Sequence, residues 1–272
     1  MSLITITQSL GSGDPGIARQ VAQALEVELF DDNRLKQKAG ELGVHSEDLK
    51  KLDEKAPGFL DRFFSAKPAA YLDYMEAVIY EVARIGNGVI IGHGSPILLQ
   101  GFDCALHVYI HASLKTRIIN LMEQQDIDTK MSEDLVRKSD ENKRKFYRYA
   151  FNLEWDDPSL YDLYLNTDKL GSASTIKLIT AAARSDEAQA CSLTALDTMT
   201  RLALERKLQA KLLEDNIDLS MISLTFPEKN VVAVSGFTYS DRDKNRLLEI
   251  LNADPDISEV RARVALMQHL GE

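Results

Sequence analysis

The segment "ITITQSLGSGDPGIARQVAQAL", residues 4–25, contains the main evidence for the fold class. An apolar, β-branched run ends in a glycine-rich turn, and a helical pattern with Ile17, Val21 and Leu25 on one face follows directly. A strand, a glycine turn and a helix in this order are typical of a phosphate-binding loop, whose backbone N–H groups hold phosphate oxygens. The usual Gly-Lys-Ser/Thr ending is replaced by Asp14-Pro15-Gly16. The sequence therefore predicts the turn and leaves open whether it still binds phosphate.

Strands and helices alternate after this segment. Apolar, β-branched runs predict further strands that begin at about Gly88, Ala105 and Tyr161. Helical patterns lie at about residues 32–42, 46–64, 69–86, 113–124, 131–150 and 174–184. This alternation predicts an α/β fold with a parallel sheet and helices on both faces. The glycine turn then lies at the carboxyl edge of the sheet, where such folds bind ligands.

The pattern changes after residues 185–195, a small and polar segment that we expect to be a linker. A helix at about 197–214 precedes two short runs, "MISLTF" and "VVAVSG", which predict a β-hairpin. A helix at about 241–252 and the run "VRARVAL" complete an α-β-β-α-β unit. The sequence therefore predicts two domains, residues 1–185 and residues 196–270.

Composition excludes several classes of protein. The 272 residues carry a net charge of −10, which argues against nucleic-acid binding through overall charge. No window approaches about 18 continuous apolar residues and the N-terminus lacks a signal-peptide pattern, so we expect no transmembrane segment and a cytoplasmic protein. Cys104 and Cys191 are far apart and form no Cys-x-x-Cys motif, so we expect buried thiols and no metal site.

Five landmarks in the first 185 residues resemble, in order, those of the cytidylate kinase-like family. They are "ITITQSLGSG", "FDDNRLKQKAGELGV", "GVIIGHGSPILL", "ALHVYIHASLKTRI" and "DENKRKFYRYAFNLEWDDPSLYDLYLNT". The resemblance implies a P-loop kinase-like fold and ATP-dependent phosphorylation of a nucleoside monophosphate such as CMP, with ATP and Mg²⁺ as cofactors. It also implies that the donor phosphates lie against Gly11, Ser12, Gly13 and Gly16.

Asp14 is the main departure from this pattern. It stands where a standard phosphate-binding loop has a lysine and where members of the family often have a further glycine. Asp is a favoured N-cap and Pro is favoured at the first helical position, so we expect the Asp14 carboxylate to accept the N–H of Gly16 or Ile17. A phosphate would otherwise use these donors, and Pro15 has no N–H. The sequence therefore predicts a loop that is filled by the protein's own anion.

Two further candidate nucleotide-binding residues have two interpretations each. His93 stands where the family has an arginine, so it either weakens the grip on an acceptor nucleotide or is a turn residue with a satisfied hydrogen bond. Asp32, which follows Asp31, either orients a ribose or Mg²⁺ or caps the helix that follows. We favour capping for Asp32, because Asp is common at helix N-termini.

A basic segment, residues 137–148 (RKSDENKRKFYR), holds six Lys/Arg and two acids. By resemblance it is a lid that closes over the phosphoryl group, and three of its arginines share one helical face. The alternative is a solvated charged helix. Asp157 and Asp162 are expected to pair with these arginines when no ligand is bound. The candidate catalytic residues are Arg117, Arg144 and Arg148, and Arg137 is a candidate for nucleotide binding.

Residues 197–267 resemble a BON domain in "LALERKLQAKLLED", "VVAVSGFTYS" and "DRDKNRLLEIL". BON domains are associated with phospholipid surfaces, or act as small ligand-binding or interaction modules. Residues 195–270 hold ten Lys/Arg and twelve Asp/Glu, so an anionic lipid is not attracted overall. We therefore expect a regulatory or dimerising module, through which the chain would form a homo-oligomer.

Three functions fit the sequence. The first is a nucleoside monophosphate kinase, and the second is a non-catalytic relative that binds a nucleotide or other phosphate-bearing small molecule and signals through the second domain. The third is a scaffold in which both domains serve oligomerisation. The segment Asp14-Pro15-Gly16 favours the second function, whereas the basic lid favours the first.

Overall fold

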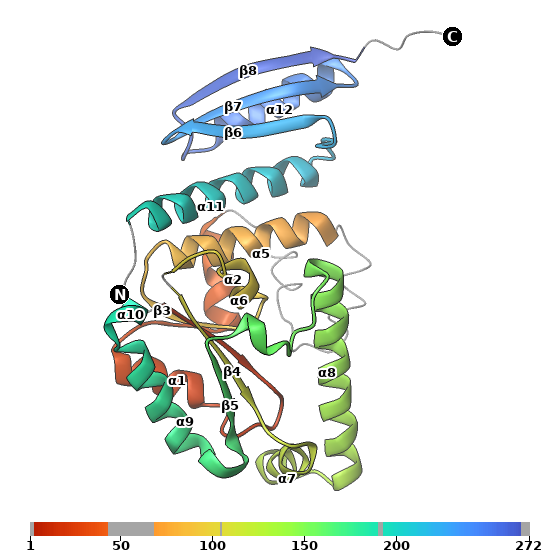
Figure 1. The fold of residues 1–272 in the computed structure, drawn as a ribbon. Coiled ribbons are helices and arrows are strands. Elements are labelled where there is room, and N and C mark those ends of the chain that lie inside the picture. Colours follow the sequence, from red (N-terminus) through yellow and green to blue (C-terminus); the bar gives the residue numbers. More distant parts are fainter. Residues whose placement is uncertain (1–2, 43–67, 104, 190–192, 268–272) are drawn as a thin grey trace.

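The computed structural model describes residues 3–42, 68–103, 105–189 and 193–267. Within these ranges the chain forms one sheet of five strands and one of three (Figure 1). The helix expected at 46–64, Cys104 and Cys191 lie outside the described residues. We call residues 3–189 the five-stranded part and residues 193–267 the three-stranded part.

The five-stranded sheet is parallel, as predicted. Its strands are β1 (Leu3–Gln8), β2 (Leu29–Phe30), β3 (Gly88–Ile91), β4 (Ala105–His111) and β5 (Leu163–Asn166). They lie in the order β2-β3-β1-β4-β5, and every neighbouring pair is parallel. The sequence did not predict β2, because two residues are too few to show an alternating pattern.

Helices cover both faces of this sheet, which confirms the predicted layers. On one face α1 (Ile17–Leu25) and α9 (Thr167–Ala183) pack side by side over Ile4 and Ile6. The side chains of Leu3 and Tyr109 point to the opposite face, because successive residues of a strand alternate. That face is covered by α2 (Asp32–Glu41), α5 (Pro68–Ala83), α6 (Ser95–Leu98) and α8 (Thr129–Phe151). The remaining helices within the described residues of the five-stranded part are α7 (Leu114–Gln125), η2 (Pro158–Leu160) and α10 (Asp186–Gln189).

Helix α9 begins seven residues before the expected position and is kinked at Gly171. Gly171 has φ 63° and ψ 173°, a backbone conformation that side chains disfavour. The residues before the kink form a short first turn capped by Asn166, whose side chain accepts the N–H of Asp168. The kink directs Ser172 toward the glycine turn after β1.

The three-stranded part has the predicted α-β-β-α-β order. It consists of α11 (Leu193–Glu214), β6 (Ile222–Glu228), β7 (Val231–Thr238), α12 (Asp241–Ala253) and β8 (Glu259–Leu266). β6 and β7 form the expected antiparallel hairpin, and β8 pairs parallel to β7. Helix α12 packs on this sheet, with Leu247 and Leu251 buried against Val232 and Val234.

Helix α11 lies between the two sheets (Figure 1). One of its faces, with Met199, Ala203 and Ala210, belongs to the core that contains α5. Another face, with Leu208 and Leu212, belongs to the core of the small sheet. The helix is therefore buried on two sides, and the predicted boundary near residues 185–195 stays a prediction.

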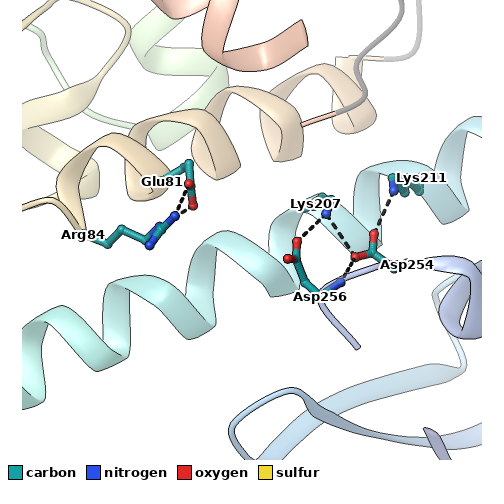
Figure 2. Close-up of polar contacts among 6 residues, drawn as sticks. All are labelled: Glu81, Arg84, Lys207, Lys211, Asp254 and Asp256. Atoms are coloured by element: carbon teal, nitrogen blue, oxygen red, sulfur yellow. Dashed lines mark hydrogen bonds and ion pairs between the residues drawn. The ribbon is translucent and has the colours of Figure 1, made fainter. Parts of the chain in front are cut away.

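A buried ionic network fixes α11 to the turn that follows α12. Lys207 donates to Asp254 at 3.0 Å and to Asp256 at 2.7 Å, and Lys211 donates to Asp254 at 2.8 Å (Figure 2). Burial alone would raise the pKa of Asp254, but hydrogen bonds from Lys211, the Asp256 amide and Lys207 lower it. Burial alone would lower the pKa of Lys207, but its bonds to Asp256 and Asp254 raise it.

None of the helices in the described ranges combines the length and the apolar character that a membrane span requires.

Candidate functional site

The glycine turn between β1 and α1 lies at the carboxyl edge of the sheet, as predicted. Gly11 and Gly13 have φ values of 80° and 95°, which favour glycine. A Cβ atom at Gly11 would lie 2.4 Å from the Arg117 carbonyl oxygen, so no larger residue fits there. The backbone therefore keeps the close turn of a phosphate-binding loop.

Asp14 fills this turn with its own carboxylate. Its Oδ1 accepts the N–H of Gly16 at 2.7 Å, which is one of the two bonds expected from the sequence, and its Oδ2 accepts from Gln20 Nε2 at 3.0 Å. The expected helix start is wrong by two residues, because α1 begins at Ile17 and Gly16 is its N-cap. The Ile17 N–H bonds to the Asp14 carbonyl oxygen at 3.2 Å, so Asp14 holds a turn rather than capping the helix.

Three other N–H groups of the turn also have partners within the chain. Ser12 N donates to Ser9 O and Gly13 N donates to Gly11 O, each at 3.0 Å. Asp14 N donates to Ser172 Oγ at 3.0 Å, the residue placed by the kink in α9. The Ser12 hydroxyl is buried and lies within hydrogen-bonding distance of Ser9 O (2.7 Å) and Ile110 O (3.0 Å).

Side chains from α7 and α8 bind the carbonyl groups of the turn. Arg117 Nε donates to Leu10 O at 2.7 Å, and Asn120 Nδ2 donates to Gly11 O at 2.8 Å. Gln124 Nε2 donates to Gly13 O at 3.0 Å. Lys143 Nζ donates to Gln8 O at 2.6 Å and lies 4.7 Å from the centre of the Trp155 ring. Carbonyl groups of the turn are therefore bound within the chain, as several of its N–H groups are.

Arg117 acts as a structural bridge in this arrangement. The residue is 7% exposed, and its guanidinium binds Asp140 of α8 through two bonds of 2.7 and 2.8 Å. Together with its bond to Leu10 O, this contact joins α7, the glycine turn and α8. A bidentate arginine–carboxylate pair is among the strongest polar contacts in proteins. The sequence identified Arg117 but not Asp140, its partner.

The arginines of α8 have carboxylate partners other than those expected. Arg148 Nε donates to Glu154 at 2.7 Å, and Arg144 lies 3.9 Å from the same carboxylate. Arg137 pairs with Glu133 one turn earlier on the helix. The expectation for the two aspartates is wrong: Asp157 accepts the Ser159 N–H and Asp162 accepts the His107 N–H. The Asp157 bond is local to its turn, whereas the Asp162 bond reaches β4, 55 residues away in the sequence.

Arg137, Arg144 and Arg148 remain largely accessible. Their side chains are 61%, 46% and 62% exposed, so solvent screens the ion pairs they make. The structure therefore separates two groups of candidates. Arg117 is buried in the framework, whereas the three arginines of α8 lie where a ligand can reach them.

His93 and Asp32 bind each other. His93 has φ 56° in the turn after β3, is 2% exposed, and its Nε2 lies 2.9 Å from Asp32 Oδ1. The expected capping role belongs instead to Asp31, which accepts the Arg34 N–H at 3.0 Å. Gly94 follows in the same turn, where a Cβ would lie 2.5 Å from the Phe151 ring of α8. His93 is thus a turn residue whose Nε2 has a hydrogen-bond partner, and its role toward a nucleotide stays a prediction.

The residues of the turn do not fit an ATP triphosphate. The Asp14 carboxylate carries a negative charge in the turn and accepts the N–H of Gly16. The Ser12 hydroxyl lies against two carbonyl oxygens and is unsuited to hold Mg²⁺. Among the described residues, no group of three or more His, Cys, Asp or Glu side chains is arranged to hold a metal ion.

Sequence reasoning missed several residues that build this site. Ser172, Asn120 and Lys143 bind the turn from elements far from it in the chain. Lys143 was part of the basic segment, but a basic run alone does not show which side chain turns inward. Glu154 follows α8 and belongs to no sequence motif that would indicate its partner. Only the sheet order, which brings α7 and α8 beside β1, places these residues together.

Comparisons with known proteins agree with this fold. A cytidylate kinase from Methanothrix thermoacetophila is 26% identical over 186 residues, covering 67% of this chain and 98% of the relative. A cytidylate kinase from Pyrobaculum islandicum is 25% identical over 180 residues, covering 65% of this chain and 90% of the relative. The crystal structure of an uncharacterized protein from Eubacterium ventriosum matches with a TM-score of 0.54 at 17% identity, covering 67% of this chain and 97% of that one.

The solved structure supports the fold alone, because its identity is low. The sequence pattern of one family matches residues 3–169, which is more than half of the chain. These residues run from β1 through the glycine turn and α8 to the first turn of α9. The chain therefore belongs to the cytidylate kinase-like family.

Proposed function

We propose that this protein binds a nucleotide or another phosphate-bearing small molecule without transferring phosphate from ATP. The observation that carries the proposal is the bond from Gly16 N–H to the Asp14 carboxylate at 2.7 Å. In this state a donor phosphate has lost one of its backbone donors. It also meets a negative charge where the loop of a kinase would supply a positive one.

Electrostatics supports this proposal. Two unit charges about 4 Å apart repel by about 4 kcal/mol at an effective dielectric constant of about 20. A triphosphate at the turn would meet this repulsion from Asp14, which is exposed and therefore partly screened. The bonds from Ser172 and Gln20 further stabilise the closed turn.

The accessible arginines of α8 are the proposed ligand contacts. Arg144 and Arg148 share Glu154, and a phosphate group would compete with this carboxylate for two guanidinium groups. Arg137 lies further along the same helix, paired only with exposed Glu133. Ligand binding would then exchange internal ion pairs for contacts with the phosphate.

A second candidate function is phosphorylation of CMP or a similar monophosphate by ATP and Mg²⁺. Family membership and the two constrained glycines, Gly11 and Gly13, favour this candidate. It requires the Asp14 carboxylate to leave the turn when ATP arrives. The kinase and the non-catalytic binder therefore differ in one measurable respect, which is turnover.

The three-stranded part is proposed to be a BON-like module that regulates or dimerises the chain. Its α-β-β-α-β order supports this proposal. Its face opposite α12 leaves Phe237 47% exposed, as a self-associating surface would. We propose a homo-oligomer that forms through this part in the cytoplasm.

Calorimetry with ATP and with CMP, each with and without Mg²⁺, tests the main proposal. We expect CMP or inorganic phosphate to bind and ATP to bind weakly or not at all. A coupled assay of ADP formation should show no turnover above the no-enzyme rate. Mg²⁺-dependent ATP binding together with CMP-dependent ADP formation would establish the kinase instead. Absence of binding by every nucleotide and by phosphate would favour the scaffold.

A further inference from the structure

The contact between α5 and α11 contains more acid than base. Arg206 of α11 lies between two carboxylates of α5, with Nε 2.6 Å from Glu76 and Nη1 3.6 Å from Asp73. The side chains of Asp73 and Glu76 are only 17% and 16% exposed. Glu205, the residue before Arg206, adds a third carboxylate to the same group. The Arg206 guanidinium is therefore the counter-charge of three carboxylates that are largely shielded from solvent.

A neutral tyrosine, Tyr80, lies beside this acidic cluster (Asp73, Glu76 and Glu205). Tyr80 of α5 is buried. This burial, together with the negative charge of Glu76, raises the pKa of Tyr80 to about 12. Tyr74, one residue after Asp73, donates its hydroxyl proton to Glu214 of α11 at 2.6 Å. The Tyr80 hydroxyl stays protonated at neutral pH and supplies no positive charge. The excess of negative charge must be relieved by a proton or by separation of the helices.

The cluster lies at the joint between the two parts of the chain. Helix α11 contributes to both cores, so its contact with α5 holds the three-stranded part against the five-stranded part. Figure 2 also shows the Glu81–Arg84 pair at the C-terminal end of α5, beside α11. The hydrogen bonds that Arg84 donates to Glu81, with a smaller contribution from the charge of Asp256, raise the pKa of Arg84.

We propose that the α5–α11 contact is a proton-dependent joint, closed when the acidic cluster holds one proton and loosened when all three carboxylates are ionised. With one proton bound, the cluster and Arg206 carry a net charge of −1. Loss of this proton leaves −2 beside an apolar core. This inference does not depend on which ligand the α8 arginines bind.

The sign of the pH dependence follows from the groups that face Asp73. Burial, opposed by Arg206 and reinforced by Glu76 and Glu205, raises the pKa of Asp73 to about 7. Burial also raises the pKa of Glu76. A carboxyl with a raised pKa in the closed state binds its proton more tightly there, so the closed state loses stability as pH rises from the open-state pKa to the closed-state pKa. The joint should therefore loosen between about pH 4 and pH 7 and change little above that.

Hydrogen–deuterium exchange of the full chain tests the joint. The opening constant of α5 and α11 amides, corrected for the intrinsic pH dependence of exchange, should rise about 30-fold from pH 5.5 to pH 8.5 for one carboxyl whose pKa moves from 3.8 to about 7. Amides of β1 and β4 should not follow this change. Wild-type opening constants that are equal at the two pH values would overturn the proposal.

Three variants assign the effect to the cluster. Asp73→Asn should reduce the rise severalfold, because the main titrating group is gone, whereas Asp197→Asn, an exposed acid of α11, should keep the wild-type rise. If Asp73→Asn does not fold, Glu205→Gln gives the same test from a partly exposed position, where removal of one charge should also reduce the rise. An unchanged rise in both Asp73→Asn and Glu205→Gln would place the titrating group elsewhere and refute the proposal.

Discussion

Arg206 and Lys207 are consecutive residues of α11 that bind carboxylates in different parts of the chain. Arg206 binds Glu76 of α5, and Lys207 binds Asp254 after α12. Consecutive helical positions point about 100° apart, so one turn of α11 can hold two neighbours at once. The helix therefore connects the two sheets through polar groups as well as through its apolar faces.

The Lys207–Asp254 contact should contribute to stability. In Asp254→Asn two lysines lose a carboxylate whose side chain is fully buried, and the free energy of unfolding should fall by about 3 kcal/mol. Denaturant unfolding at pH 7 measures this loss, with Glu249→Gln on the exposed side of α12 as the control. The wild-type contribution should also disappear as the pH falls below about 4, because the pKa of Asp254 is lowered in the folded state. Equal stability of the two variants would contradict this expectation.

Arg117 should behave as a structural residue. Arg117→Ala leaves Asp140 without its bidentate partner and Leu10 O without a donor, so the ligand-free protein should lose about 2–3 kcal/mol of stability. A double-mutant cycle with Asp140→Ala should give a coupling energy above about 1 kcal/mol. If Arg117→Ala keeps the wild-type stability and loses only ligand binding, Arg117 is a ligand-binding residue and not a structural one.

Asp14→Lys should strengthen ATP binding. The variant removes the carboxylate that takes the Gly16 N–H and restores a positive charge, so we expect ATP affinity to rise at least about tenfold. Calorimetry with MgATP measures this change. Glu187→Lys, which alters an exposed residue of α10 by the same charge, is the control. If the wild-type protein already binds MgATP with low-micromolar affinity, the filled turn is not an obstacle.

Arg144→Ala and Arg148→Ala should weaken phosphate or nucleotide binding about tenfold or more. Each removes one guanidinium that shares Glu154, and charge-assisted bonds contribute roughly 1.5–3 kcal/mol when partly desolvated. The melting temperature of the ligand-free protein should stay nearly unchanged, because both side chains are largely exposed. Wild-type affinity in both variants would show that the basic face is only solvated surface.

Limited proteolysis should cut near residues 185–195 and yield a fragment of about 190 residues. The two pieces should nevertheless stay together in gel filtration, because α11 packs along α5. Cutting at pH 8.5 should release them more readily than cutting at pH 5.5, if the joint depends on a proton. Cleavage inside the described β-strands of residues 3–166 before this site would argue against two domains.

The sequence predicted most of the framework because its signals are local. The run before Gly11 and the run from Gly88 show β-branched apolar residues that end in glycine turns, which indicates strands without knowledge of the neighbours. The Asp14–Gly16 bond was also predictable, because it joins residues two apart. Local patterns thus suffice for elements and for turns.

The partners of the charged residues were not predictable in this way. Arg117 meets Asp140 and Arg148 meets Glu154 only after α7 and α8 have folded against the turn. Asp32 binds His93, which is 61 residues away in the sequence, and the neighbouring Asp31 caps α2 instead. These contacts depend on the sheet order, and the acidic residues involved stand in no motif.

The two-sided burial of α11 also has a consequence for inheritance. A gene that ended before α11 would leave the apolar side of α5 facing water, and a gene that began after it would leave the small sheet without Leu208 and Leu212 of its core. The proteins encoded by two separate genes could not both contain α11 if only one copy of its coding segment existed. Recombination that separates the two parts is therefore penalised unless the coding segment for residues 193–214 is duplicated, and the pair is expected to pass between genomes as a single piece.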